Sequence, residues 1–369
     1  MAQMQVSRGS LSWQPVARTP AHGSAKGAGR VSIRAPMFSL LLAVAVASSC
    51  TAGGEDPAPS EPSSSTSTLE PVVDLPEPSE IEALPGVETI IATPFPDFMV
   101  IAFGRVWVGG VDDGVGVFDP ATGASLGSVE ARPCTPMDAG FGAVWSGDCS
   151  APRSVVRIDP NSMQVTGQVE VPFSDEGSVA AGEGAVWMVG DGEGCAGCLL
   201  YRIDPETMDI TDTYEMPEAS FAARAAFGAV WVTVPGADVV LRIDPETGQI
   251  EQEIATGNGP RFLAVGEGGV WVMTAGDGGV AHIDPASGSV VASIAVDSGF
   301  IAGGDIAVGE GYVWVRDIDQ MVARIDPSTD RVVEWLGPPR GSGGVAAGSG
   351  NLWVSAHDAL TIYLVPLGP

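Results

Sequence analysis

Short apolar segments alternate with glycine-rich turns along most of this chain. In one representative stretch the apolar segments cover residues 262–265, 270–273, 280–283 and 290–294. Each segment is strand-sized, and the glycines between them can adopt the positive φ that tight turns require. The pattern predicts four antiparallel strands joined by three short turns in about 40 residues.

The same unit recurs seven times. A Gly-x-Val-Trp motif or a close variant marks each copy, 38 to 44 residues after the previous one. A second marker, Asp-Pro, follows every tryptophan but the last. The tryptophans are Trp107, Trp145, Trp187, Trp231, Trp271, Trp314 and Trp353. Seven copies of a four-stranded antiparallel sheet predict an all-β fold, a seven-bladed β-propeller.

The Asp-Pro turns have a structural interpretation. Proline fixes φ at the first turn position, aspartate accepts hydrogen bonds from the turn backbone, and the glycine that often follows adopts the left-handed conformation. On this interpretation Asp159, Asp204, Asp244 and Asp326 are structural. The alternative is a ring of carboxylates that serves chemistry.

The two ends of the repeat complement each other. The last copy has apolar segments at 345–347, 352–355 and 360–365 and then lacks a fourth strand. Residues 86–93 resemble the fourth strands of other copies. We therefore expect blade seven to combine residues 86–93 with 344–366, which removes an exposed sheet edge.

The N-terminal segment has the features of an export signal. Residues 1–49 carry five basic and no acidic side chains, and the apolar run 38–47 is too short to span a bilayer. Ala-Ser-Ser precedes Cys50, which resembles a bacterial lipobox and implies lipidation of Cys50. An ordinary secretory signal with an incidental cysteine is the alternative. A start near Val31 would give a signal of ordinary length.

The net negative charge of the chain disfavours some classes of binding partner. The chain has a formal charge of −29, and beyond residue 49 twelve basic side chains face 46 acidic ones, which gives −34. Such a chain is a poor binder of nucleic acid or anionic lipid. Residues 50–85 are rich in Pro, Ser, Thr and acid, which predicts a disordered tether between the signal segment 1–49 and the propeller 86–366.

The repeat resembles a known group of bacterial propellers. The pattern Ala-x-Gly-x-Gly-x-Val-Trp-Val followed by Arg-Ile-Asp-Pro-x-Thr-Gly is similar to seven-bladed propellers of the YVTN/YncE-like kind. It also resembles the related NHL-repeat and streptogramin-lyase (virginiamycin B lyase-like) propellers. It departs from WD40 repeats, because aspartate never follows the tryptophan. The resemblance implies fold; these propellers host binding, scaffolding and lyase activities.

Four cysteines lie within the predicted propeller. Cys134 and Cys149 occupy loops expected on one face, which favours a bridge between them. Cys195 and Cys198 share one loop, where a local disulfide, free thiols or, least favoured, a redox pair are the alternatives. An even number of cysteines in a protein outside the cytoplasm favours disulfides, although four cysteines could also bind zinc.

Alignment on the tryptophans locates a candidate ligand site at one mouth of the channel. The position seven residues before each tryptophan is mostly alanine, but Asp138 and Arg224 depart from that rule. Positions nine and ten residues before the tryptophan add further candidates. The candidate set is Asp97, Phe98, Asp138, Arg224, Arg261, Phe262 and Asp305. The alternative is that Asp138 and Arg224 form a buried structural pair or face channel water.

Catalytic signatures are sparse. His282 stands where other repeats carry arginine, and His357 lies in a loop of the last repeat. Streptogramin-lyase activity requires histidine, carboxylates and a divalent metal, and no such set aligns here. Acidic turns such as Asp112–Asp113 lack the ligand spacing of an EF-hand loop. We assign no catalytic residue, metal ligand or cofactor.

The functional expectation is therefore recognition without catalysis. We expect a monomeric, membrane-anchored protein outside the cytoplasm that recognises an envelope protein, a glycan or a small polar ligand. A metal-dependent lyase-like enzyme and a purely architectural scaffold are the alternatives.

Overall fold

The computed structural model describes residues 79–92, 94–174, 176–296, 300–301, 303–317, 321–338 and 341–368. The chain divides into Met1–Ser67 and Thr68–Pro369, and all described residues belong to the second unit. Cys50 and the expected signal segment lie outside the described residues.

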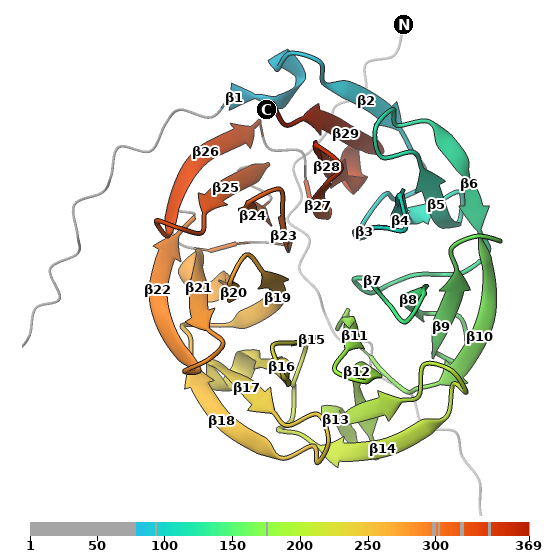
Figure 1. Ribbon diagram of the computed structural model, residues 1–369, viewed down its shortest axis with the longest axis vertical. Helices are drawn as coiled ribbons and strands as arrows, with labels where there is room; N and C mark the ends of the chain where they lie inside the picture. The colour runs from blue at the N-terminus through green and yellow to red at the C-terminus, as the bar shows by residue number, and fades with distance from the viewer. Residues whose placement is uncertain are drawn as a thin grey trace, which may run out of the picture. The chain divides into compact units, whose positions relative to one another are not determined.

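Seven four-stranded antiparallel sheets form a ring, as the repeat predicts (Figure 1). In blades one to six the four antiparallel strands run in sequence order from the channel outward, whereas the outermost strand of blade seven comes from the N-terminal end of the described chain. Blades one to three contain β3 (Met99–Ala102), β4 (Arg105–Val111), β5 (Gly114–Phe118) and β6 (Ser125–Val129); β7 (Asp138–Gly140), β8 (Ala143–Asp148), β9 (Ser154–Asp159) and β10 (Gln164–Glu170); β11 (Val179–Gly182), β12 (Ala185–Gly192), β13 (Cys195–Ile203) and β14 (Ile210–Glu215).

The remaining blades follow the same plan, with short 3₁₀ turns in some of their loops. Blades four and five contain β15 (Ala223–Ala226), β16 (Ala229–Val234), η2 (Pro235–Ala237), β17 (Val239–Ile243) and β18 (Ile250–Ala255); β19 (Pro260–Gly266), β20 (Gly269–Thr274), η3 (Ala275–Asp277), β21 (Gly279–Asp284) and β22 (Ser289–Ala295). Blades six and seven contain β23 (Asp305–Gly309), β24 (Tyr312–Arg316), β25 (Val322–Asp326) and β26 (Arg331–Gly337); β27 (Val345–Gly348), β28 (Asn351–Ala356), η4 (His357–Ala359), β29 (Thr361–Pro366) and β2 (Glu88–Ile91).

The N-terminal strand completes the last blade. Strand β2 pairs antiparallel with β29, in the register Glu88 to Leu364 and Ile90 to Ile362. In Figure 1 the blue β2 lies beside the red β29, which joins the two ends of the repeat. The first strands of neighbouring blades also contact one another all around the ring, including β27 with β3. The prediction of closure is confirmed.

The structure differs from the sequence prediction at the end of the expected tether. Ser79 and Glu80 form β1, which pairs in parallel with β26 as a fifth strand of blade six. Ile81, in the following turn η1 (Ile81–Ala83), is fully buried in the cluster that contains Trp314. The assignment of residues 79–85 to a disordered tether is therefore wrong, because Ile81 inserts into the propeller.

The repeated tryptophans form the core between the blades. All seven are fully buried on the second strand of their blade. Each pairs across the sheet with the residue seven positions earlier, as for Trp145 with Asp138 and Trp231 with Arg224. The sequence alignment on tryptophan is thus the structural register of the innermost strands.

The Asp-Pro turns have the structure that their composition predicts. In Asp159, for example, Oδ1 accepts hydrogen bonds from the amides of Asn161 and Ser162 and from the Ser162 hydroxyl. These bonds hold the pKa of the Asp159 carboxyl below its usual range. Asp204, Asp244 and Asp326 likewise accept two backbone amides of their turns. Their role in closing the turns is structural.

Candidate functional site

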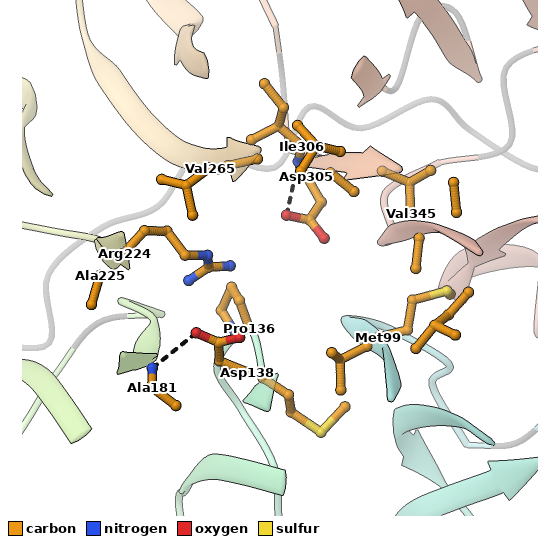
Figure 2. A pocket seen from close by; sticks show the side chains of 18 residues that line it. Met99, Pro136, Asp138, Ala181, Arg224, Ala225, Val265, Asp305, Ile306 and Val345 are labelled. Carbon is orange, nitrogen blue, oxygen red and sulfur yellow. Dashed lines mark hydrogen bonds between the residues drawn. The ribbon is translucent and has the colours of Figure 1, made fainter. Parts of the chain in front are cut away.

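A cavity of about 250 Å³ lies among the innermost strands, inside the channel. Its wall is largely apolar, with side chains such as Met99, Val265 and Val345. Three charged side chains, Asp138, Arg224 and Asp305, line the same cavity. Figure 2 shows them pointing inward from three different blades. The structure thus brings three of the seven candidate residues together.

Arg224 is held by backbone groups on one side only. Its Nη1 donates to the carbonyl of Ala223 at 3.0 Å and to that of Val179 at 3.5 Å. Within the described residues it forms no ion pair at 4.0 Å or less with Asp138 or Asp305. Arg224 therefore acts on Asp138 through its charge and not through a direct bond, and its remaining guanidinium donors are available to the cavity.

Asp138 joins two blades. Its Oδ1 accepts the amide of Ala139 at 2.8 Å, and its Oδ2 accepts the amide of Ala181 in blade three at 2.9 Å. Burial raises the pKa of this carboxyl, while the charge of Arg224 and the two amides act in the opposite direction.

Asp305 lies at the start of β23 in blade six, two residues before the position that pairs with the tryptophan. Only 5% of its surface is exposed, and its Oδ1 accepts the amide of Ile306 at 2.8 Å. Burial raises its pKa to about 7, against the opposing charge of Arg224 and with a further raising effect from Asp97. The carboxyl therefore changes its charge near neutral pH, inside a cavity that also holds a guanidinium.

Two further candidates, Phe98 and Phe262, pack against each other. Their ring centroids are 5.4 Å apart in an edge-to-face arrangement, although they come from blades one and five. Phe221 of blade four joins them, with its centroid 5.3 Å from that of Phe262. Sequence reasoning missed Phe221, although it occupies the same repeat position as Asp97 and Arg261. These rings belong to the core and do not line the cavity.

Asp97 and Arg261 lie outside the cavity. Arg261 lies over the rings of Phe221 and Phe262, at 4.9 and 5.6 Å, and its Nη2 is 3.9 Å from the carboxylate of Glu176. Asp97 is half-buried, and burial raises its pKa to about 6, partly offset by the charge of His357. Three of the seven candidates therefore line the cavity, and the other four lie outside it.

Both pairs of cysteines are disulfides. Cys134 is bonded to Cys149, and Cys195 is bonded to Cys198. The first bridge joins the segment before β7 to the segment after β8, as expected. The second lies within the first four residues of β13.

His282 and His357 lie apart from the cavity. His282 pairs across the sheet with Trp271 and stacks on it at 3.8 Å, where Arg242 lies over Trp231 in the previous blade. His357 is 2.9 Å from Asp358 in η4. In the described part of the chain, no three His, Cys, Asp or Glu side chains are grouped as a metal site would need.

Comparison with known proteins supports the fold. No family model matches the chain, and no curated protein matches it. The structure is similar to the WD40 domain of Neurospora crassa Pan2, with a TM-score of 0.58 and 11% identity over 74% of this chain and 90% of that one. It also resembles BamB from Moraxella catarrhalis, with a TM-score of 0.49 and 13% identity over 71% and 82% of the two chains. The chain is a seven-bladed β-propeller, and such distant likenesses carry no function with them.

Among the described residues, no helix has the length and apolar composition that a membrane span needs.

Proposed function

We propose that this chain is a binding propeller that holds a small polar ligand in its channel cavity. One observation carries the proposal. Asp138, Arg224 and Asp305 point into one cavity, yet the arginine is ion-paired with neither carboxylate. Opposite charges that share a buried space normally pair, since an uncompensated buried charge is costly. A ligand placed between them would satisfy all three.

The chemistry of the cavity limits the ligand. When both carboxylates are ionised, the three groups carry one net negative charge. Asp305 favours an ammonium group or a hydroxyl donor, and Arg224 favours a carboxylate or another acceptor. The cavity is smaller than the roughly 300–1,000 Å³ pockets of drug-sized ligands. Small zwitterions such as amino acids are therefore the best candidates.

We further propose that the propeller works outside the cytoplasm, anchored by a lipid on Cys50. Two disulfides support an oxidising compartment. The small residues before Cys50 support lipidation. The repeat motif supports membership of the YVTN/YncE-like, NHL and streptogramin-lyase-like group. We propose residues 1–49, 50–78 and 79–368 as signal segment, tether and propeller.

Thermal unfolding with a panel of ligands tests the cavity. The panel compares amino acids with matched amines, matched carboxylates and neutral sugars. A ligand at about 100 times its Kd adds about 2.7 kcal/mol of stability, which raises the Tm. The shift should disappear in Arg224→Ala and persist in Arg331→Ala, which removes an exposed arginine on β26. No shift with any class, or a shift indifferent to Arg224, contradicts the proposal.

A further inference from the structure

The turns between the first and second strands of the blades form a ring around one end of the channel. We call this ring the turn rim. In every blade its first turn residue is not glycine, yet it adopts a left-handed φ of 48–58° and precedes a glycine. The seven residues, in blade order, are Phe103, Phe141, Glu183, Phe227, Glu267, Glu310 and Ser349.

The glutamates of the turn rim have a structural role. Glu183 accepts the amide of Gly228 at 3.0 Å, and Glu267 accepts that of Gly311 at 3.1 Å. Glu310 does the same for Gly350 at 3.1 Å. Each carboxylate thus bonds to the turn of the following blade. This charge-assisted bond offsets the cost of placing a non-glycine residue in left-handed backbone.

The phenylalanines have no such compensation. A phenyl ring has no carboxylate with which to accept the amide of the next blade, and a bulky residue is a poor choice for left-handed backbone. Phe103, Phe141 and Phe227 also leave 47%, 49% and 44% of their surface exposed. Stability of the ring would be better served by glutamate in all three places. The fold alone does not account for these residues.

The turn rim surrounds the end of the cavity. Ile101, Ala225 and Val265 line the cavity, and each stands two residues before a rim residue of the same strand and turn. A molecule that covers the exposed phenylalanines therefore also lies over the channel.

Charge identifies the occupant. The turn rim carries three glutamates beside its three phenylalanines, and the whole chain has a formal charge of −29. A second copy, an anionic membrane or a nucleic acid carries the same sign and is repelled. A cationic protein surface is attracted, and its Lys and Arg side chains can also lie over phenyl faces. We propose that the turn rim is a docking surface for a protein segment in which Lys or Arg side chains flank apolar ones.

A substitution that improves the fold while destroying the surface tests this proposal. Replacing Phe103, Phe141 and Phe227 together by glutamate supplies the missing inter-blade acceptor and removes apolar surface. The Tm of the full chain should stay unchanged or rise. Binding is measured by fluorescence anisotropy with a short labelled peptide of Arg, Lys, Leu and Phe, at about 0.15 M ionic strength, where weak surface attraction is screened. Affinity should fall about tenfold or more, as when interface hot spots are lost.

The sign of the effect separates docking from simple charge attraction. The triple variant is more negative than the wild-type chain, so non-specific attraction of a basic peptide would strengthen. The converse variant, Glu183→Phe, extends the apolar surface over blades one to four and removes the bond to Gly228. It should bind the peptide more tightly while its Tm falls. Unchanged or tighter binding by the triple variant, or no binding by the wild-type chain, overturns the proposal. Neither result bears on the small-ligand cavity, which is tested with different probes.

Discussion

The indole N–H of Trp231 donates to the carbonyl of Ala226 at 3.0 Å, across the turn that joins the first two strands of blade four. The bond ties a buried core residue to the turn rim. The tryptophans of blades one to six all make it, at 3.0–3.2 Å. In blade seven the indole nitrogen of Trp353 is buried and has no hydrogen-bond partner among the described residues.

This difference gives a matched pair of substitutions. Trp231→Phe removes buried ring volume and leaves the carbonyl of Ala226 without its donor. Trp353→Phe removes similar volume together with an unsatisfied donor. We expect Trp231→Phe to lower the free energy of unfolding by about 1–3 kcal/mol more than Trp353→Phe does, which is the usual cost of an unpaired buried polar group. Urea unfolding of both variants measures the difference. Equal losses would mean that the indole bond adds nothing to the ring.

Closure of the ring by β2 gives a second prediction. Ile90 is partly buried on the fourth strand of blade seven and packs against the cluster that contains Trp353. A carboxylate at this position is desolvated without a partner, so Ile90→Asp should cost at least about 2 kcal/mol of unfolding free energy. Ile250 is the matched control, because it lies on the fourth strand of blade four with 38% of its surface exposed.

Ile250→Asp should therefore be nearly neutral by comparison. Limited proteolysis provides a second readout, since loss of the β2 pairing frees residues 79–92 for cleavage before the rest of the chain unfolds. Equal stability of the two aspartate variants would show that β2 contributes little to closure.

The sequence predicted the fold because each blade repeats its own signals. The tryptophan motif recurs seven times and the Asp-Pro turn six times, each beside the same apolar segments, and the incomplete ends complement each other. It failed at Ile81, because a single apolar residue among prolines and acids gives no periodic signal. The parallel pairing of Ser79 with Leu336 joins segments at opposite ends of the propeller sequence.

The candidate site was predicted only in part, for a physical reason. The tryptophan alignment gives the level of a residue along the innermost strand, and three residues that it singled out, Asp138, Arg224 and Asp305, line one cavity. It does not give the reach of the side chain. Phe98 and Phe262 share a repeat position with Asp305. Their side chains are long enough for the two phenyl rings to meet, although they come from different blades, and so they do not line the cavity.

The titration of Asp305 gives the last prediction. Burial raises its pKa to about 7, whereas an aspartate in an unfolded chain titrates near 3.9. Between these values the folded state binds more protons than the unfolded state, so stability falls as pH rises from about 4 to about 7. Asp97, with its pKa raised to about 6, contributes in the same direction over the lower part of that range. Arg224 opposes the shift of Asp305, so part of the cost of ionisation is already offset in the folded protein.

The substitution Asp305→Asn isolates the contribution of Asp305 to the pH dependence of stability. The amide cannot ionise, and its oxygen can still accept the amide of Ile306. The variant should therefore lose less stability than the wild-type chain between pH 6 and pH 7, where a single titrating group contributes up to about 1.4 kcal/mol per pH unit. Asp284→Asn is the control, because hydrogen bonds from Ser287 hold the pKa of that exposed carboxyl below its usual range. The test compares the urea unfolding midpoints of the wild-type chain and the two variants across this pH range. Parallel curves for wild type and Asp305→Asn would mean that Asp305 stays ionised, and that the cavity keeps its full negative charge throughout.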